Sequence, residues 1–194
     1  MGMFILGTAG FFLYFIYDIN SVKWKNTVFQ KFFGLGSLFL VVSTIGTLLK
    51  IFDVKQIKKP TGLLFLAAGV FFFGLLIYTL FFALPFDQTY LEESRQRLAY
   101  TEGMYGLSRH PGVLWFAGLY LCLWGLSGFV LEGIFFIFMI IWNVLYVIFQ
   151  DIWTFPRTFT NYSEYKKKTP FLIPDKESIR VCISTWNVLN RGER

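Results

Sequence analysis

The residues of this chain best suited to binding or catalysis lie between Gly103 and Pro111, where a basic side chain, the single histidine and a helix-starting proline occur together. Pro111 suits the first turn of a helix, where its missing N–H group is not needed. The free N–H groups of that turn carry partial positive charge, and Arg109 adds a full charge beside them. Such a helix start binds a carboxylate or a phosphate. In a simpler interpretation, Arg109 anchors the helix at lipid headgroups and His110 caps it.

A second segment suited to binding begins at Asp151 and mixes acidic, aromatic and basic residues. Asp151 ends an apolar run, where an ionised carboxylate is costly unless it has a partner or contacts water. We therefore expect Asp151 to face the helix bundle or a cofactor, with a salt bridge to Arg109 or Arg157 as the structural alternative. Tyr162 and Tyr165 are compatible with a binding site and also with an aromatic belt at the membrane interface.

The elements that must position these residues are membrane-spanning helices. Of the 194 residues, 55% are hydrophobic and 21% aromatic, which leaves too few polar side chains to cover a soluble domain of this size. A span requires about 20 apolar residues, and the runs lack the alternation of a transmembrane barrel. We therefore predict an all-α integral membrane protein of about five transmembrane helices, at residues 3–19, 32–52, 61–86, 112–131 and 133–150.

The last two predicted spans should form a helical hairpin, because only the neighbourhood of Glu132 and Gly133 separates them. A hairpin returns its second helix to the side of the membrane from which the first helix began. The topology therefore predicts that Arg109 and His110, at the start of the hairpin, face Asp151 at its end.

The basic residues are distributed unequally across the predicted topology. With five spans, one side of the membrane carries fourteen Lys and Arg residues, and the other side carries only Lys50, Lys55, Lys58 and Lys59. The positive-inside bias then places the C-terminus in the cytoplasm, in a multi-pass protein of the inner or plasma membrane. The net charge of +6 predicts contact with anionic lipid headgroups and gives no reason to expect a nucleic-acid partner.

The chain shows no internal repeat, so we predict one membrane domain, residues 1–194, with a tail at 175–194. The first apolar run lacks the basic start and the cleavage site of a signal peptide, which predicts a retained helix. Residues 90–98 are amphipathic and are expected at the membrane surface. Residues 178–190 should form either an interfacial amphipathic helix or a frayed end.

The two cysteines, Cys122 and Cys182, give no indication of a metal site or a disulfide framework. Their spacing does not match a zinc motif, and each is compatible with simple packing. No metal is therefore expected at the candidate site.

Together, the two segments resemble the membrane methyltransferase family of isoprenylcysteine carboxyl methyltransferase and its phospholipid-methyltransferase relatives. The family pattern has a Leu, a Gly-x-Tyr and an Arg-His-Pro that opens a helix. After a hairpin follow an acidic residue, a Phe, Tyr-x-x-Tyr-Lys and a stretch closed by prolines. The matching residues here, within about 98–174, are Leu98, Gly103, Tyr105, Arg109, His110, Pro111, Asp151, Phe159, Tyr162, Tyr165, Lys166, Pro170 and Pro174. The chain departs from the pattern at Val113, Trp115 and Gln150.

The resemblance implies S-adenosylmethionine as the methyl donor, bound near the cytoplasmic ends of the last two helices. It implies that His110 and the helix start hold the methionine carboxylate, and that Tyr105 or Trp153 faces the sulfonium. The candidate catalytic residues are Arg109, which would orient the acceptor, and Asp151, which would also bind the ribose or amino group. The candidate cofactor-binding residues are Leu98, Gly103, Tyr105, His110, Pro111, Asp151, Tyr162 and Tyr165. The acceptor is expected to be a membrane lipid or a lipophilic small molecule with a carboxylate, amine or hydroxyl group.

Two other classes of function stay open. A membrane reductase of the sterol-reductase type would bind NADPH, and Lys166, Lys167 and Lys168 would then contact its 2′-phosphate. A non-enzymatic lipid-binding protein would bind neither cofactor.

Overall fold

A computed structural model of the chain describes residues 1–83 and 97–190, and the regular structure over these residues is entirely helical. The predicted surface segment 90–98 lies outside the described residues, apart from Arg97 and Leu98. The same holds for the last residues of the predicted span 61–86.

The contacts within the chain define two compact units. Unit 1 comprises Met1–Phe72 and Phe116–Thr154, and unit 2 comprises Phe73–Trp115 and Phe155–Arg194. The predicted single domain depends on how the two units are joined, and it stays a prediction.

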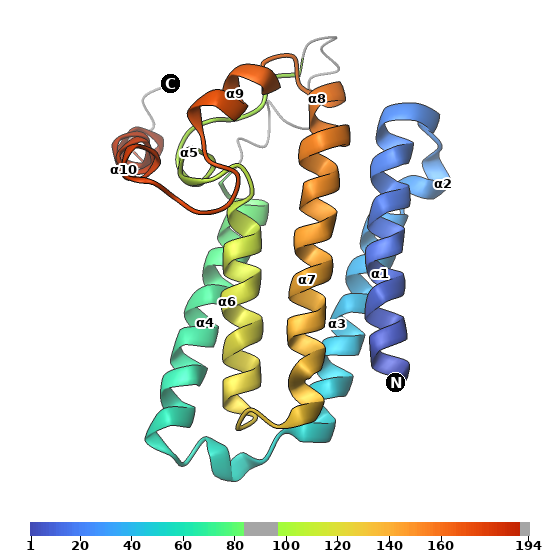
Figure 1. Ribbon diagram of the computed structural model, residues 1–194, viewed down its shortest axis with the longest axis vertical. Helices are drawn as coiled ribbons and strands as arrows, with labels where there is room; N and C mark the ends of the chain where they lie inside the picture. Colours follow the sequence, from blue (N-terminus) through green and yellow to red (C-terminus); the bar gives the residue numbers. More distant parts are fainter. Residues whose placement is uncertain (84–96, 191–194) are drawn as a thin grey trace. The chain divides into compact units, whose positions relative to one another are not determined.

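Unit 1 is built around helix α1, against which two other long helices pack (Figure 1). These helices are α1 (Gly2–Ile19), α3 (Phe32–Ile51) and α7 (Ile134–Phe149). The short α2 (Thr27–Gln30) precedes α3, and the Asn26 side chain caps it by accepting a hydrogen bond from the Val28 N–H at 2.8 Å. An asparagine at this position fixes where the helix starts, because it satisfies an N–H group that has no partner within the helix.

Four helical stretches of the described residues are long and apolar enough to cross a membrane: Gly2–Trp24, Thr27–Ile51, Pro60–Phe81 and Leu131–Thr158. They correspond to four of the five predicted spans. The other span is α6 (Pro111–Leu126), whose 16 residues make an apolar helix below this length. A helix of that length extends about 24 Å, against about 30 Å for the hydrocarbon core. The prediction of an all-α membrane protein is confirmed.

The predicted hairpin is present, but its turn comes earlier than expected. α6 ends at Leu126 because the backbone enters the left-handed region at Gly128 (φ 78°) and Phe129 (φ 56°), a conformation that terminates helices. A 3₁₀ turn, η4 (Leu131–Gly133), then leads into α7. The Tyr120 ring of α6 packs edge-on against Phe136 of α7, with ring centroids 5.6 Å apart. The apolar residues after Leu126 therefore belong to the turn.

Both α1 and α7 continue past their predicted ends as π-helical turns. These are η1 (Asn20–Trp24) and η5 (Gln150–Thr154). The Asn20 side chain is fully buried and bonds both ways with the Asn26 backbone, through Nδ2 to the carbonyl at 2.9 Å and through Oδ1 to the N–H at 2.8 Å. π turns are rare in proteins, and those that occur are often found at functional sites. The two π turns therefore mark a candidate functional region within unit 1.

The backbones of α1 and α3 come into direct contact at Gly10 and Gly36. A Cβ atom placed on Gly36 would lie 2.7 Å from the Gly10 carbonyl oxygen, and one placed on Gly10 would lie 2.8 Å from the Gly36 carbonyl oxygen. Small residues allow helices in membranes to approach closely and to gain packing contacts. Any larger residue at either position would push the two helices apart.

Over its described residues, unit 2 contains the end of α4 (Pro60–Phe81), the start of α6 and four shorter helices. The shorter helices are α5 (Met104–Leu107), α8 (Phe155–Thr158), α9 (Tyr162–Lys168) and α10 (Lys176–Asn190). α5 packs against α10, so that a Cβ atom on Gly106 would lie 2.9 Å from Val181 Cγ1. The C-terminal segment is thereby folded onto the loop that precedes α6.

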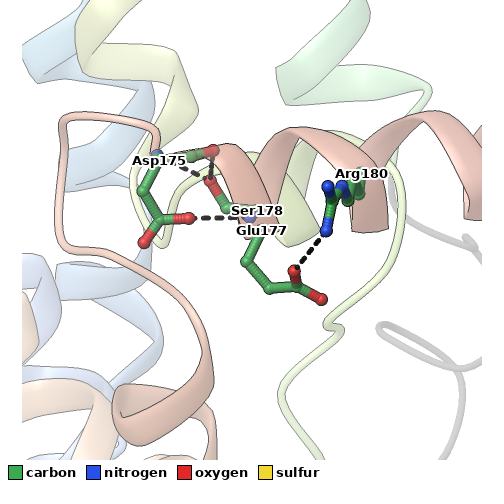
Figure 2. Close-up of polar contacts among 4 residues, drawn as sticks. All are labelled: Asp175, Glu177, Ser178 and Arg180. Atoms are coloured by element: carbon green, nitrogen blue, oxygen red, sulfur yellow. Dashed lines mark hydrogen bonds and ion pairs between the residues drawn. The ribbon is translucent and has the colours of Figure 1, made fainter.

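Helix α10 has a reciprocal cap at its start (Figure 2). The Asp175 Oδ1 atom accepts a hydrogen bond from the Ser178 N–H at 2.8 Å, and the Ser178 hydroxyl accepts one from the Asp175 N–H at 3.0 Å. Two N–H groups at the helix start are satisfied in this way. Of the two alternatives for residues 178–190, the structure shows the helix, which starts earlier, at Lys176. Its position at a membrane surface stays a prediction.

Candidate functional site

The predicted start of the hairpin is confirmed, because α6 begins at Pro111. The three residues before it are buried. The Ser108 hydroxyl accepts a hydrogen bond from the His110 N–H at 3.2 Å and donates one to the Phe171 carbonyl oxygen at 3.0 Å. This side chain therefore fixes the helix start and joins it to the C-terminal segment of unit 2.

Arg109 makes the largest set of bonds between these two segments. Its backbone N–H donates to the Pro170 carbonyl oxygen at 3.0 Å. Its Nη1 atom donates to the carbonyl oxygens of Thr169 at 2.7 Å and Lys166 at 3.2 Å, and its guanidinium group lies over the Phe171 ring at 5.6 Å. Charge-assisted hydrogen bonds of a buried arginine are strong. Arg109 thus holds the chain from Lys166 to Phe171 against the start of α6.

The His110 ring lies against two aromatic rings of the C-terminal segment. It stacks on Phe155 with centroids 5.5 Å apart and an interplanar angle of 10°, and it meets Phe171 edge-on at 5.2 Å. Only 6% of His110 is exposed. The imidazole is therefore held in a largely apolar, water-poor environment, where its interaction with a charged ligand would be strengthened.

Tyr105 and Tyr165 connect α5 with α9. The Tyr165 hydroxyl donates to the Tyr105 carbonyl oxygen at 2.6 Å, and the Tyr105 hydroxyl donates to the Thr79 carbonyl oxygen near the end of α4 at 3.2 Å. The two predicted site residues are therefore positioned by each other and by α4.

Tyr162 and Tyr165 belong to a buried cluster with Ala99, and Phe155 and Phe159 pack against it. Only 2% of Tyr162 and 4% of Tyr165 are exposed. A tyrosine in an interfacial belt would contact lipid headgroups, so this burial favours a structural or binding role within unit 2.

Gly103 and Leu98 differ in backbone conformation and in burial. Gly103 has φ 55° and ψ −128°, a conformation that requires glycine, and its N–H donates to the Thr185 hydroxyl at 2.8 Å. Leu98 is 67% exposed. Next to it, the Ala99 backbone bonds to the Asn161 side chain at 2.7 and 3.1 Å. Gly103 therefore shapes the site, whereas the Leu98 side chain lies outside its buried part.

Asp151 lies in η5 of unit 1, where it is 5% exposed. Asp151 belongs to unit 1, whereas Arg109, His110 and Arg157 belong to unit 2. The sequence predicts that Asp151 faces Arg109 and His110, or alternatively that it pairs with Arg157. Both stay predictions.

Unit 2 also carries a group of exposed lysines and a cysteine thiol. Lys166, Lys167 and Lys168 are exposed on α9, with the Lys166 ammonium 5.9 Å from the centre of the Tyr162 ring. Burial raises the pKa of the Cys182 thiol. A raised pKa leaves less thiolate at neutral pH, so Cys182 is a poor candidate for a nucleophile.

The segments that pack together in unit 2 carry the residues of the family resemblance except Asp151, which lies in unit 1. No family model, curated protein or solved structure matches this chain. The fold and the contacts are therefore the evidence on which a function can be proposed.

Asp18 of α1 is a buried acidic residue that is not among the predicted site residues. It is 4% exposed in the helical bundle of unit 1. A sequence signal was present, because Asp18 is an acidic residue inside the apolar run at 3–19.

Proposed function

We propose that this chain is an S-adenosylmethionine-dependent methyltransferase that acts on a membrane-embedded or amphiphilic acceptor. The proposal depends on one observation, the packing of the Gly103–Pro111 segment against the chain from Phe155 to Phe171 within unit 2. Ser108, Arg109 and Tyr165 make the hydrogen bonds between them. A site that binds a cofactor needs its side chains held in place by such supporting contacts.

The residues at the start of α6 are chemically suited to this cofactor. The helix start provides N–H groups and partial positive charge for a carboxylate, and His110 lies beside it. Among the described residues, a Cβ atom on Gly112 would have only Leu76 Cδ1 within 4 Å, at 3.9 Å, so these residues leave the backbone of the first turn open to close approach. The aromatic side chains of Tyr105 and Phe171 present π faces of the kind that stabilise a sulfonium.

When bound, the cofactor supplies an electrophilic methyl group, which a direct displacement passes to the acceptor. The protein then has to align the two reactants and exclude water. In unit 2, the buried cluster around Tyr162 and Tyr165 would exclude water, and the hydrogen bonds of Arg109 would fix the surrounding backbone. Arg109 therefore acts at least as a positioning residue. The predicted contact of Arg109 with the acceptor is a further role, which the Arg109→Ala variant tests.

Incubation of the purified protein with membrane lipid extracts and a methyl-labelled donor tests the proposal and identifies the acceptor. We expect a labelled lipophilic product. The variant His110→Phe keeps an aromatic ring beside Phe155 and removes the ring nitrogens, so it should lower kcat/KM by about 10–100-fold. The matched control is Tyr78→Phe, which also removes one polar atom from an aromatic ring of unit 2 and should leave activity unchanged.

Three results would count against the proposal. Failure of well-folded protein to label any lipid would remove its main support. Undiminished transfer by a folded Arg109→Ala variant would remove the role of Arg109. Thermal stabilisation by NADPH, without any by S-adenosylmethionine or its product, would favour the reductase.

A further inference from the structure

The carboxyl group of Asp18 lies inside the membrane-spanning bundle of unit 1. It belongs to the candidate span Gly2–Trp24 and is 4% exposed. Ionisable side chains within spans are costly, and they commonly mark ion pathways or binding sites. Asp18 has no role in the proposed methyl transfer, so its burial needs a separate explanation.

Three polar side chains near the end of α7 surround this carboxyl group. The Thr154 hydroxyl donates to Asp18 Oδ2 at 3.4 Å. Tyr146 and Gln150 are also within hydrogen-bonding reach of the carboxyl group, and Gln150 Nε2 donates to the Tyr146 hydroxyl at 2.9 Å. The Tyr146 ring is held by Tyr14, with centroids 5.4 Å apart. The Asp18, Tyr146 and Thr154 side chains therefore place oxygen atoms close together, and the Gln150 amide holds the Tyr146 hydroxyl.

The carboxyl group has no basic partner within the part of the chain that the structure describes. Of the described residues, none forms an ion pair with Asp18. The Lys23 ammonium of η1 lies instead over the Trp153 ring, 5.7 Å from its centre. A buried carboxylate with only neutral partners leaves its charge uncompensated, which is strongly unfavourable in a medium of low dielectric constant.

The backbone around Asp18 also departs from regular α-helix. The π turns η1 and η5 begin two residues after Asp18 and at Gln150, respectively. A change from i→i+4 to i→i+5 bonding inserts an extra residue into the helical turn, and such π turns occur frequently at functional sites. Here the Ser21 hydroxyl donates to the Asp18 carbonyl oxygen at 2.7 Å. The partial negative charge at the end of α1 adds to the attraction for a cation.

We propose that Asp18, Tyr146 and Thr154 form an intramembrane binding site for one sodium ion, with Gln150 holding the Tyr146 hydroxyl in place. Their oxygen atoms are hard donors, which favour hard cations over transition metals. A single carboxylate balances one positive charge, and the described residues contain no group of three His, Cys, Asp or Glu side chains for a divalent metal. The bound ion would hold α1 to the end of α7. This site is independent of the methyltransferase proposal.

Thermal unfolding of the full chain in a neutral detergent tests this site, with intrinsic tryptophan fluorescence as the readout. Choline chloride is replaced by sodium chloride at constant ionic strength. We expect the thermal midpoint (Tm) of the wild type to rise by about 3–6 °C in sodium, as for a ligand that binds only the native state. The rise should be larger at mildly alkaline than at mildly acidic pH, because protons compete with sodium for the carboxylate.

Three variants locate the effect. Asp18→Asn should abolish the sodium-dependent rise, and Thr154→Val should reduce it. Asp53→Asn is the matched control, because Asp53 is exposed outside the site, and it should retain the full rise. Equal Tm values of the wild type in sodium and choline would overturn the proposal, and so would a rise that persists in Asp18→Asn. A Tm that follows pH but not sodium would assign a proton to Asp18 and would also overturn the sodium site. If Asp18→Asn does not fold, the wild type and Thr154→Val still decide the question.

Discussion

The two units of this chain are stabilised by different kinds of contact. In unit 1, helices pack through glycine contacts, stacked aromatic rings and polar side chains buried between spans, as at Gly10, Gly36 and Asp18. In unit 2, short helices and loops are joined by side chains that bond to backbone carbonyl oxygens, above all those of Arg109 and Tyr165. Unit 1 should therefore be sensitive to side-chain volume. Unit 2 should be sensitive to the loss of single polar atoms.

The strongest test of this difference is a volume change in unit 1. Gly36→Val would place its Cβ atom 2.7 Å from the Gly10 carbonyl oxygen, a backbone atom that cannot turn away. We expect a loss of about 3 kcal/mol and a fall in Tm of about 6–12 °C, measured by thermal unfolding in detergent. Gly34→Val is the matched control in the same helix, because a Cβ atom there has nothing within 4 Å. Equal effects of the two variants would show that the contact of α1 with α3 is not tight.

The corresponding test of unit 2 removes the charge of Arg109. Arg109→Gln should leave the carbonyl oxygens of Thr169 and Lys166 without their donor, which costs about 2 kcal/mol locally. We expect trypsin to cleave at Lys166–Lys168 about 30-fold faster, because the opened segment becomes more populated.

The control for that change is Arg180→Gln. Arg180 pairs with Glu177 at 3.5 Å, and both side chains are more than two-thirds exposed, at 79% and 72%. An exposed pair contributes little, so cleavage should change less than about 3-fold. If both variants were cleaved equally fast, Arg109 would not be holding the C-terminal segment.

A smaller effect is expected from the removal of a single hydroxyl group. Tyr165→Phe deletes the donor of the 2.6 Å bond to the Tyr105 carbonyl oxygen and keeps the ring. We expect a local loss of about 1.5 kcal/mol and about 10-fold faster cleavage. Tyr78→Phe serves as the matched control, and cleavage of this variant at the wild-type rate is the expected result. An unchanged rate in Tyr165→Phe would mean that this bond does not stabilise unit 2.

The smallest effect should come from the cap of α10 (Figure 2). Ser178→Ala removes the hydroxyl that accepts from the Asp175 N–H, so the start of the helix should lose about 1 kcal/mol. Hydrogen exchange of the first turns of α10 should then be about 5-fold faster. Glu177→Ala changes the neighbouring exposed residue and should have less than half this effect on the free energy. Equal exchange in the two variants would contradict the assigned cap.

The parts of the fold that could be predicted from the sequence are those set by composition over many residues. Long apolar runs identified α1, α3, α4 and α7, and Pro60 and Pro111 are the first residues of their helices, as expected for proline. The end of α6 was predicted too late. Apolar residues continue past Leu126, and the left-handed turn at Gly128 and Phe129 depends on backbone geometry that hydropathy does not record.

The candidate site was predictable only where the residue type determines the role. Pro111 and Gly103 have the backbone functions that their types indicate, and Arg109 is buried next to the C-terminal segment, whereas its role in a binding site stays a prediction. The bonds of Arg109 to Thr169 and Lys166 could not be foreseen, because carbonyl acceptors are present at every residue. The partners of Asp18 could not be foreseen, because they lie far along the sequence, at the end of another helix.

The most direct test of the central claim is isothermal titration calorimetry of the full chain in detergent with S-adenosylhomocysteine, the product of the proposed methyl donor. We predict one binding site on the wild type, weaker binding by His110→Phe and unchanged binding by Gly74→Ala, where an added Cβ atom has nothing within 4 Å. If folded wild-type protein gives no binding heat at several temperatures, the methyltransferase proposal is contradicted.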